Sequence, residues 1–139
     1  MNLTPFLSAN SRGTAGVLLL TLVAVEYGGW FMLRIVRGRQ PVTAFQQAFF
    51  RAGHAHAGVL VILALVGQIL VDATTLSGPL ADLARDGIWV AAILMPSGFF
   101  LSAAGKGVTT PNRFIILLYL GAASLTIGVV SLGIGLLTA

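Results

Sequence analysis

Four long apolar segments dominate this sequence and restrict the chain to a membrane. They cover residues 13–33, 52–71, 87–105 and 114–139, and the only charged residue within them is Glu26. A helix needs about 20 apolar residues to cross the hydrocarbon core of a bilayer, with roughly 17 to 25 tolerated. The sequence therefore predicts an all-α integral membrane protein, with residues 1–139 forming a single four-helix bundle domain.

The charge content of the chain supports this assignment and argues against a nucleic-acid partner. Charged residues make up 9% of the sequence, whereas soluble proteins carry about 25%. The formal net charge is +4, but the basic residues form short clusters between the apolar segments, as an orientation signal does. We therefore expect the lipid bilayer, and no nucleic acid, as a partner. The absence of cysteine excludes disulfides and thiolate ligands.

The distribution of the basic residues predicts the topology. The first and third connections hold six of the eight basic residues, namely Arg34, Arg37, Arg39, Arg51, Lys106 and Arg113. By the positive-inside rule, these connections face the cytoplasm and both termini lie outside. The protein is then a multi-pass protein of the plasma (inner) membrane. Within the first connection, the amphiphilic stretch 42–50 is expected to lie along the interface as a short helix.

His54 and His56 are the only histidines in the chain, and both lie at the start of the second span. An imidazole in hydrocarbon needs a hydrogen-bond partner or a metal. Two positions along a helix turn a side chain by about 200°, so the two rings cannot ligate one ion. One is expected to face a cofactor or a cavity, and the other a neighbouring helix, another subunit or the surface. A hydrogen-bonded packing role for the pair is the alternative.

Two further ionisable residues are candidates for a site. Arg51 lies three residues before His54 and therefore on the same helix face, where it suits a propionate, a phosphate or a carboxylate. It can also be an interfacial anchor. A carboxyl group as deep as that of Glu26 is usually directed inward and functional. We expect Glu26 to form a hydrogen bond with His54 or His56, or to handle protons itself.

The third span contains features of a pocket. Pro96 removes a backbone donor and kinks the helix. Trp89, Phe99 and Phe100 are then placed to form the walls for a flat apolar ligand, although packing within the bundle is the simpler explanation of aromatic residues. The turn at 109–113 is expected to cap the fourth span.

Glycines are frequent in the last span, at positions 121, 128, 133 and 135. Small residues let helix backbones approach closely in a membrane. The sequence therefore predicts close helix packing in this region, either within one bundle or between subunits.

Three short motifs carry a resemblance to a known family. They are Arg51–Gly58, with Ala-His-Ala-Gly at 55–58, then Gly98-Phe99-Phe100, and then Pro111-Asn112-Arg113. In their order and spacing, and in the number of spans, the chain resembles the small four-span membrane isomerases that include styrene oxide isomerase and, more distantly, hydroxylaminobenzene mutase. The resemblance implies a homotrimer that binds haem b between protomers.

The resemblance also implies roles for individual residues. Carried over by position, His56 is the axial ligand of the iron, with His54, Arg51, Asn112 and Arg113 as further cofactor-binding residues. The haem propionates would meet the basic cluster on the same side of the membrane, which comprises Arg34, Arg37, Arg51 and Arg113. Ferric iron would act as a Lewis acid on a small apolar epoxide, which rearranges to an aldehyde without a redox cycle.

Two positions depart from the pattern of this family. Its epoxide isomerases have an amide side chain six residues after the histidine and a phenol in the Gly-Phe-aromatic element, whereas this chain has Ile62 and Phe100. Glu26 and Phe100 are therefore the candidate catalytic residues, with Glu26 or His54 as a source of the missing polar group. The alternative functions are a non-catalytic haem sensor, carrier or assembly subunit, and a transporter, for which spans three and four offer few polar residues.

Overall fold

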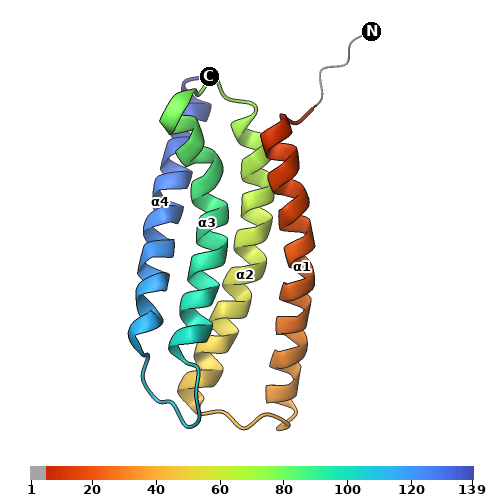
Figure 1. Ribbon diagram of the computed structural model, residues 1–139, viewed down its shortest axis with the longest axis vertical. Coiled ribbons are helices and arrows are strands. Elements are labelled where there is room, and N and C mark those ends of the chain that lie inside the picture. The colour runs from red at the N-terminus through yellow and green to blue at the C-terminus, as the bar shows by residue number, and fades with distance from the viewer. Residues whose placement is uncertain (1–5) are drawn as a thin grey trace.

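The computed structural model describes residues 6–139 as four antiparallel helices of membrane length. They are α1 (Ala9–Val36), α2 (Ala44–Val71), α3 (Gly78–Ser102) and α4 (Ile116–Leu137), and a short 3-10 turn, η1 (Arg113–Ile115), precedes α4. The helices lie in chain order, with α1 and α4 on opposite sides of the bundle (Figure 1). The predicted all-α multi-pass membrane protein is confirmed.

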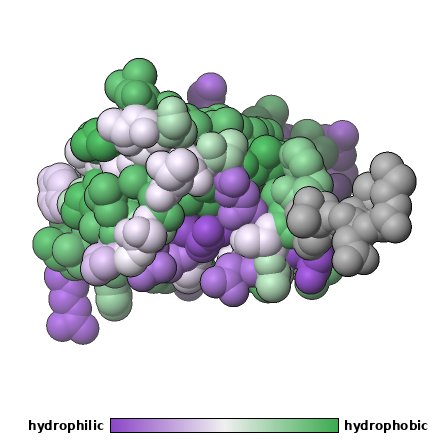
Figure 2. All heavy atoms as spheres, turned by 90° about the horizontal axis from the view of Figure 1, so that it is seen from above, coloured by the Kyte–Doolittle hydropathy of each residue, from purple (hydrophilic) through white to green (hydrophobic). Residues whose placement is uncertain are grey.

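The two ends of the bundle differ in charge. The α1–α2 and α3–α4 connections lie together at one end, which we call the basic end because it carries the six basic residues named above (Figure 1). The start of α1, the α2–α3 connection and the C-terminus lie at the other end, which we call the acidic end. Figure 2, viewed onto the acidic end, shows hydrophilic surface between apolar surfaces. Charges therefore gather at the ends of apolar helices, as a membrane requires.

The prediction of a separate interfacial helix at 42–50 is wrong, because α2 begins at Ala44 and continues through this stretch. A capping box starts the helix. The Thr43 hydroxyl accepts a hydrogen bond from the Gln46 N–H at 3.1 Å, and the Gln46 side chain accepts one from the Thr43 N–H, also at 3.1 Å. Gln46 is buried, and its amide also donates to the carbonyl oxygens of Ala103 and Gly105. This side chain thereby joins the two connections of the basic end.

The third helix also begins earlier than predicted, at Gly78 instead of residue 87. Gly78 has a φ of +61° and Pro79 lies in the first turn. A proline fits there because the first helical N–H groups have no partner within the helix. The added turns place Asp82, Arg85 and Asp86 on α3 at the acidic end.

Packing is uneven across the bundle. Helix α3 packs most extensively against α4, then against α2, whereas α1 packs mainly against α2. The largest buried cluster joins α2, α3 and α4 with Leu18 of α1. Because α1 has little contact with α3, a cleft remains between these two helices.

A polar network fastens the start of α1 at the acidic end. Arg85 of α3 forms an ion pair with Asp72, with Nη1 and Oδ1 3.1 Å apart, and donates to the Ser11 hydroxyl of α1. The Ser8 N–H donates to Asp72 Oδ2 at 2.8 Å. Asp72 is the C-cap of α2, so this network connects α1, α2 and α3.

This network predicts acid sensitivity that depends on Asp72. Partial burial by itself would raise the pKa of Asp72, but hydrogen bonds from the Ser8 backbone, Ser11 and Arg85 outweigh it and lower the pKa below its ordinary value. A lowered pKa in the folded state contributes stability above the unfolded pKa of about 3.9, and this contribution is lost as the pH falls through the folded pKa. Unfolding midpoints measured from neutral pH down through this window should therefore fall for the wild type and converge on those of Asp72→Asn.

The matched control is Asp82→Asn, since Asp82 is exposed and accepts no hydrogen bond within residues 6–139. This variant should follow the wild-type acid profile. A gap between wild type and Asp72→Asn that stays constant in acid would contradict the role of Asp72.

Candidate functional site

The two histidines of α2 lie on different sides of the helix. His54 lines the cleft between α1 and α3. His56 packs against Phe99 of α3, with ring centroids 4.9 Å apart, and does not line that cleft. Their divergence agrees with the rotation of about 200° predicted for two helical positions.

His54 fits against a pair of glycines on α1. A Cβ atom built at Gly28 would lie 3.1 Å from His54 Nδ1, and one at Gly29 would lie 3.5 Å from both Cε1 and Nε2. The edge of the imidazole that carries both nitrogens therefore faces the backbone of α1. This arrangement supports a packing role for His54, because α1 occupies the space that a metal would need. Gly28 and Gly29 are not among the residues predicted for the site, although two adjacent glycines in a span indicate close helix approach.

His56 has a defined pattern of proton donors and acceptors. Its Nδ1 lies 2.8 Å from the carbonyl oxygen of Ala52. A carbonyl oxygen only accepts, so Nδ1 carries the proton and the neutral ring has its lone pair on Nε2. Phe49 packs edge-on against Phe99 beside this ring, with centroids 5.5 Å apart. His56 therefore presents a free acceptor nitrogen in aromatic surroundings.

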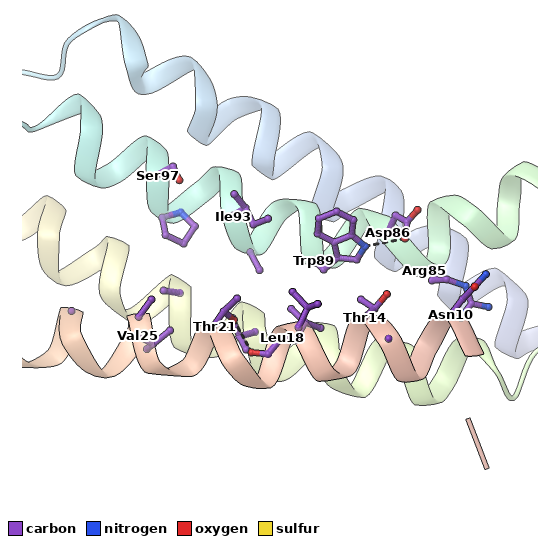
Figure 3. Close-up of a pocket in the computed structure, with 18 of the residues that line it drawn as sticks. Asn10, Thr14, Leu18, Thr21, Val25, Arg85, Asp86, Trp89, Ile93 and Ser97 are labelled. Carbon is purple, nitrogen blue, oxygen red and sulfur yellow. Dashed lines mark hydrogen bonds between the residues drawn. The ribbon is translucent and has the colours of Figure 1, made fainter. Parts of the chain in front are cut away.

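The cleft runs along the bundle between α1 and α3, with α2 as its floor (Figure 3). Its volume is about 770 Å³, and at 1.5 Å per residue the α1 residues from Asn10 to Gly28 extend over about 27 Å. Its central walls are mainly apolar, and the hydroxyl of Thr21 among them donates to the Leu18 carbonyl. The apolar residues are Val17, Leu18, Ala24, Val25, Ala57, Val61, Ala92 and Ile93. An elongated apolar space of this kind is open to lipid-soluble molecules.

The two ends of the cleft differ in chemistry. At the acidic end lie Asn10, Asp82, Arg85 and Asp86, and the Trp89 indole N–H donates to Asp86 at 2.9 Å (Figure 3). At the other end lie His54, Pro96, Ser97 and Phe100. The pocket expected beside Pro96 is therefore present, with Trp89 and Phe100 among its walls, but Phe99 faces His56 instead.

A second cavity, of about 420 Å³, lies between α1 and α2 at the basic end. Arg51 and His54 both line it, as their spacing of three residues predicts, together with Met32, Ile35, Val36 and Gln47. Arg51 is exposed. His54 thus lies between this cavity and the larger cleft.

Helix packing separates the cleft from His56. A Cβ atom at Gly53 would lie 2.9 Å from Phe99 Cβ and 3.0 Å from the Phe100 ring, so α2 and α3 touch at this level. Phe100 stacks on Phe50, with centroids 5.5 Å apart and an angle of 16° between the rings. Phe100 lines the cleft, and a molecule in the cleft does not reach His56 past this contact.

The expected hydrogen bond between Glu26 and a histidine is not formed within residues 6–139, and Glu26 is exposed. The helical rotation explains this difference. Ala24 and Gly28 line the cleft, and Glu26 lies two residues from each, which turns its side chain by about 200° to the opposite side of α1.

The residues of the third connection have mainly structural contacts. The Asn112 amide donates to the Leu101 carbonyl at 2.9 Å, and its oxygen accepts from the Phe114 N–H at 2.9 Å. These bonds close the connection and cap η1, as predicted for this turn. The Arg113 guanidinium lies over the Phe114 ring, 5.5 Å from its centroid, and is exposed at the basic end.

In the described part of the chain, no three His, Asp or Glu side chains come together as a group that could hold a metal ion. Comparison with known proteins finds no matching family model, curated protein or solved structure.

Proposed function

We propose that this chain is a membrane haem b protein in which Nε2 of His56 is the axial ligand of the iron. The observation that supports this assignment is the hydrogen bond from His56 Nδ1 to the Ala52 carbonyl. Metal-ligating histidines typically donate their second ring N–H to a backbone carbonyl or a carboxylate, which fixes the tautomer and raises the basicity of the ligating nitrogen. Within residues 6–139, His54 forms no such bond, and its nitrogens face α1.

The surroundings of His56 fit a large apolar cofactor. The ring is partly buried, with Phe99 on one side and the exposed residues Ala55 and Val59 nearby on α2. An exposed apolar surface of this kind accommodates a group shared between two protomers, in agreement with the homotrimer that the resemblance implies. Arg51 and Arg113 at the basic end are available for the propionates. The Asn112 amide donates one N–H to Leu101 and keeps a second N–H as a donor for the cofactor.

The reaction we propose is the isomerisation of a small apolar epoxide-like substrate to an aldehyde. Ferric haem, when bound, supplies a Lewis acid that polarises the substrate oxygen without a redox cycle. The protein holds the cofactor through His56 and excludes water with Phe49 and Phe99. A molecule in the cleft does not reach His56 of the same copy, because the contact of Gly53 with α3 closes that path.

A non-catalytic haem sensor, carrier or assembly subunit is the second candidate. A specific observation favours it. The isomerases that this chain resembles have a polar side chain at two positions, and both positions are apolar here. Ile62 is 60% exposed on α2, and Phe100 packs in the cleft. Of the candidate catalytic residues, Glu26 alone can then donate or accept a proton.

In the proposed orientation the basic end faces the cytoplasm, with both termini outside the plasma (inner) membrane. Arg34 lies over the Trp30 ring at 5.0 Å, and Trp30 is 50% exposed on the same side of α1. Paired aromatic and basic side chains of this kind anchor a helix at the membrane interface.

The test is an absorption spectrum of the purified protein, oxidised and then reduced, before and after the addition of haemin. A Soret band and a spectrum of a b-type haem are expected, followed by conversion of styrene oxide to an aldehyde by the haemin-loaded protein. A preparation that stays colourless after haemin addition would refute the haem assignment. Haem binding without turnover of an epoxide, nitroso or hydroxylamine compound would instead select the non-catalytic alternative.

A further inference from the structure

Glu26 and His56 lie at the same depth in the bundle. The imidazole of His54 rests against Gly28 and Gly29, and a Cβ atom at Gly58 would lie 3.9 Å from a side-chain carbon of Val25. Helices α1 and α2 are antiparallel, so the residue midway between 54 and 58 is level with residues 26–27. The carboxyl group of α1 and the free imidazole nitrogen of α2 therefore occupy one level of the membrane.

The two side chains also share one face of the protein. Glu26 is two residues from Ala24 and from Gly28, and His56 is two residues from His54; all three of these neighbours line the cleft. A rotation of about 200° turns both Glu26 and His56 away from the cleft. We call the surface they share the rear face, which comprises Glu26, Ala55, His56 and Val59. On α2 the exposed residues Ala55 and Val59 lie on the α1 side of His56.

The rear face is unsuited to contact with lipid. An ionisable side chain in the hydrocarbon core is costly, and such groups nearly always face protein or a water-filled space. Glu26 is exposed, and its carboxyl group has no hydrogen-bond partner within residues 6–139. The small side chain of Ala55 would let another helix approach closely here. A protein partner with a polar group at the same level would relieve this cost.

We propose that the rear face binds a second copy of this chain, so that Glu26 of one copy lies beside His56 of the next. In a cyclic assembly the symmetry axis is parallel to the membrane normal, so every copy keeps its residues at the same depth. Glu26 and His56 flank the rear face on opposite sides. The α1 side of the rear face carries Glu26, and the α2 side carries His56. When the rear face points toward the axis, the α1 side of one copy contacts the α2 side of its neighbour, in a dimer and in a trimer alike.

The chemistry of the two groups is complementary. His56 Nε2 holds a lone pair because Nδ1 donates to Ala52, and a carboxyl group such as that of Glu26 from the neighbouring copy is a suitable hydrogen-bond partner for an imidazole. This contact between copies needs no cofactor. A second consequence rests on the proposed haem function: with Nε2 on the iron, Glu26 of the neighbour borders the cofactor site and supplies a polar group that Ile62 and Phe100 do not.

Cysteine cross-linking tests the contact directly, because the chain contains no cysteine of its own. Two differently tagged copies, one with Glu26→Cys and one with Val59→Cys, are expressed together and oxidised in their membranes. Val59 is 64% exposed on the rear face, and its replacement leaves His56 intact. The disulfide needs Cα atoms within about 7 Å of each other, so a doubly tagged covalent dimer is expected only if the flanks meet. A second pair, Glu26→Cys with His56→Cys, should give the same product.

The matched control pairs Glu26→Cys with Leu120→Cys on α4. Leu120 is 52% exposed, and it lies at a similar depth because Gly121 packs on Met95 and Gly98 on Leu118. This pair should form little covalent dimer. Equal cross-linking through Leu120, or none through Val59 and His56, would overturn the proposal. Cross-linking through Val59 in a protein that fails to bind haemin would retain the contact between copies and reject the cofactor, so the two proposals fail separately.

Discussion

Replacing His56 with alanine is expected to abolish the Soret band of the haemin-loaded protein, whereas His54→Ala should retain it. His56 provides the nitrogen with a free lone pair, and Ala52 fixes its tautomer. His54 has its nitrogens against Gly28 and Gly29. Loss of a partner that merely orients a metal ligand costs about 10 to 100-fold in metal affinity, so loss of the ligand itself should exceed that range.

The two variants serve as controls for each other. Both remove an imidazole from the same helix, two residues apart, so their effects on membrane insertion should be similar. His54→Ala leaves a void beside α1 and should lower the thermal unfolding temperature, because large-to-small changes in packed positions destabilise. Haemin titrations followed at the Soret band, with helix content from circular dichroism, separate ligation from folding. A band that survives His56→Ala and disappears in His54→Ala would reverse the assignment.

The number and class of the helices could be predicted because they follow from local composition. Four apolar segments separated by charged connections leave the chain few alternatives in a bilayer. The divergence of His54 and His56 is also local, because it depends only on the pitch of one helix. These features needed no knowledge of how the helices pack.

The helix starts that were predicted too late, those of α2 and α3, are marked by local sequence patterns. Thr43 and Gln46 form a capping box with the spacing that marks a helix N-terminus. Likewise Ser77 followed by Gly78 and Pro79 indicates the start of α3. Hydropathy alone identifies the part of a helix inside the lipid, and it misses the helical turns beyond the lipid.

The position of Glu26 could not be predicted from the sequence. The direction of its side chain depends on which face of α1 contacts α2. Gly28 and Gly29 lie on that face, because they have no side chain and His54 packs against them. The cleft has the same origin, because α1 packs mainly against α2 and has little contact with α3. Such features depend on tertiary placement, which a single sequence does not encode in a readable local pattern.

The contact between α3 and α4 should be the most sensitive part of the fold, and Gly87→Ala is expected to destabilise it strongly. A Cβ atom at Gly87 would lie 2.6 Å from the Gly128 Cα and 2.8 Å from the Ser124 carbonyl oxygen. These are backbone atoms, so the helices must move apart. Separation would also weaken the hydrogen bond from the Ser124 hydroxyl to the Gly87 carbonyl, which is 2.8 Å long. Overpacking of this kind costs about 1 to 3 kcal/mol, occasionally more.

The control for this prediction is Gly133→Ala on α4, where an added Cβ has no atom within 4 Å. Alanine favours a helix over glycine by about 1 kcal/mol, so this variant should unfold at the wild-type temperature or slightly above it. Thermal unfolding in detergent, followed by circular dichroism, compares the two. Because both substitutions gain the same helix propensity, a lower midpoint for Gly87→Ala alone measures the close approach of the helices. Equal midpoints would show that α3 and α4 do not depend on that contact.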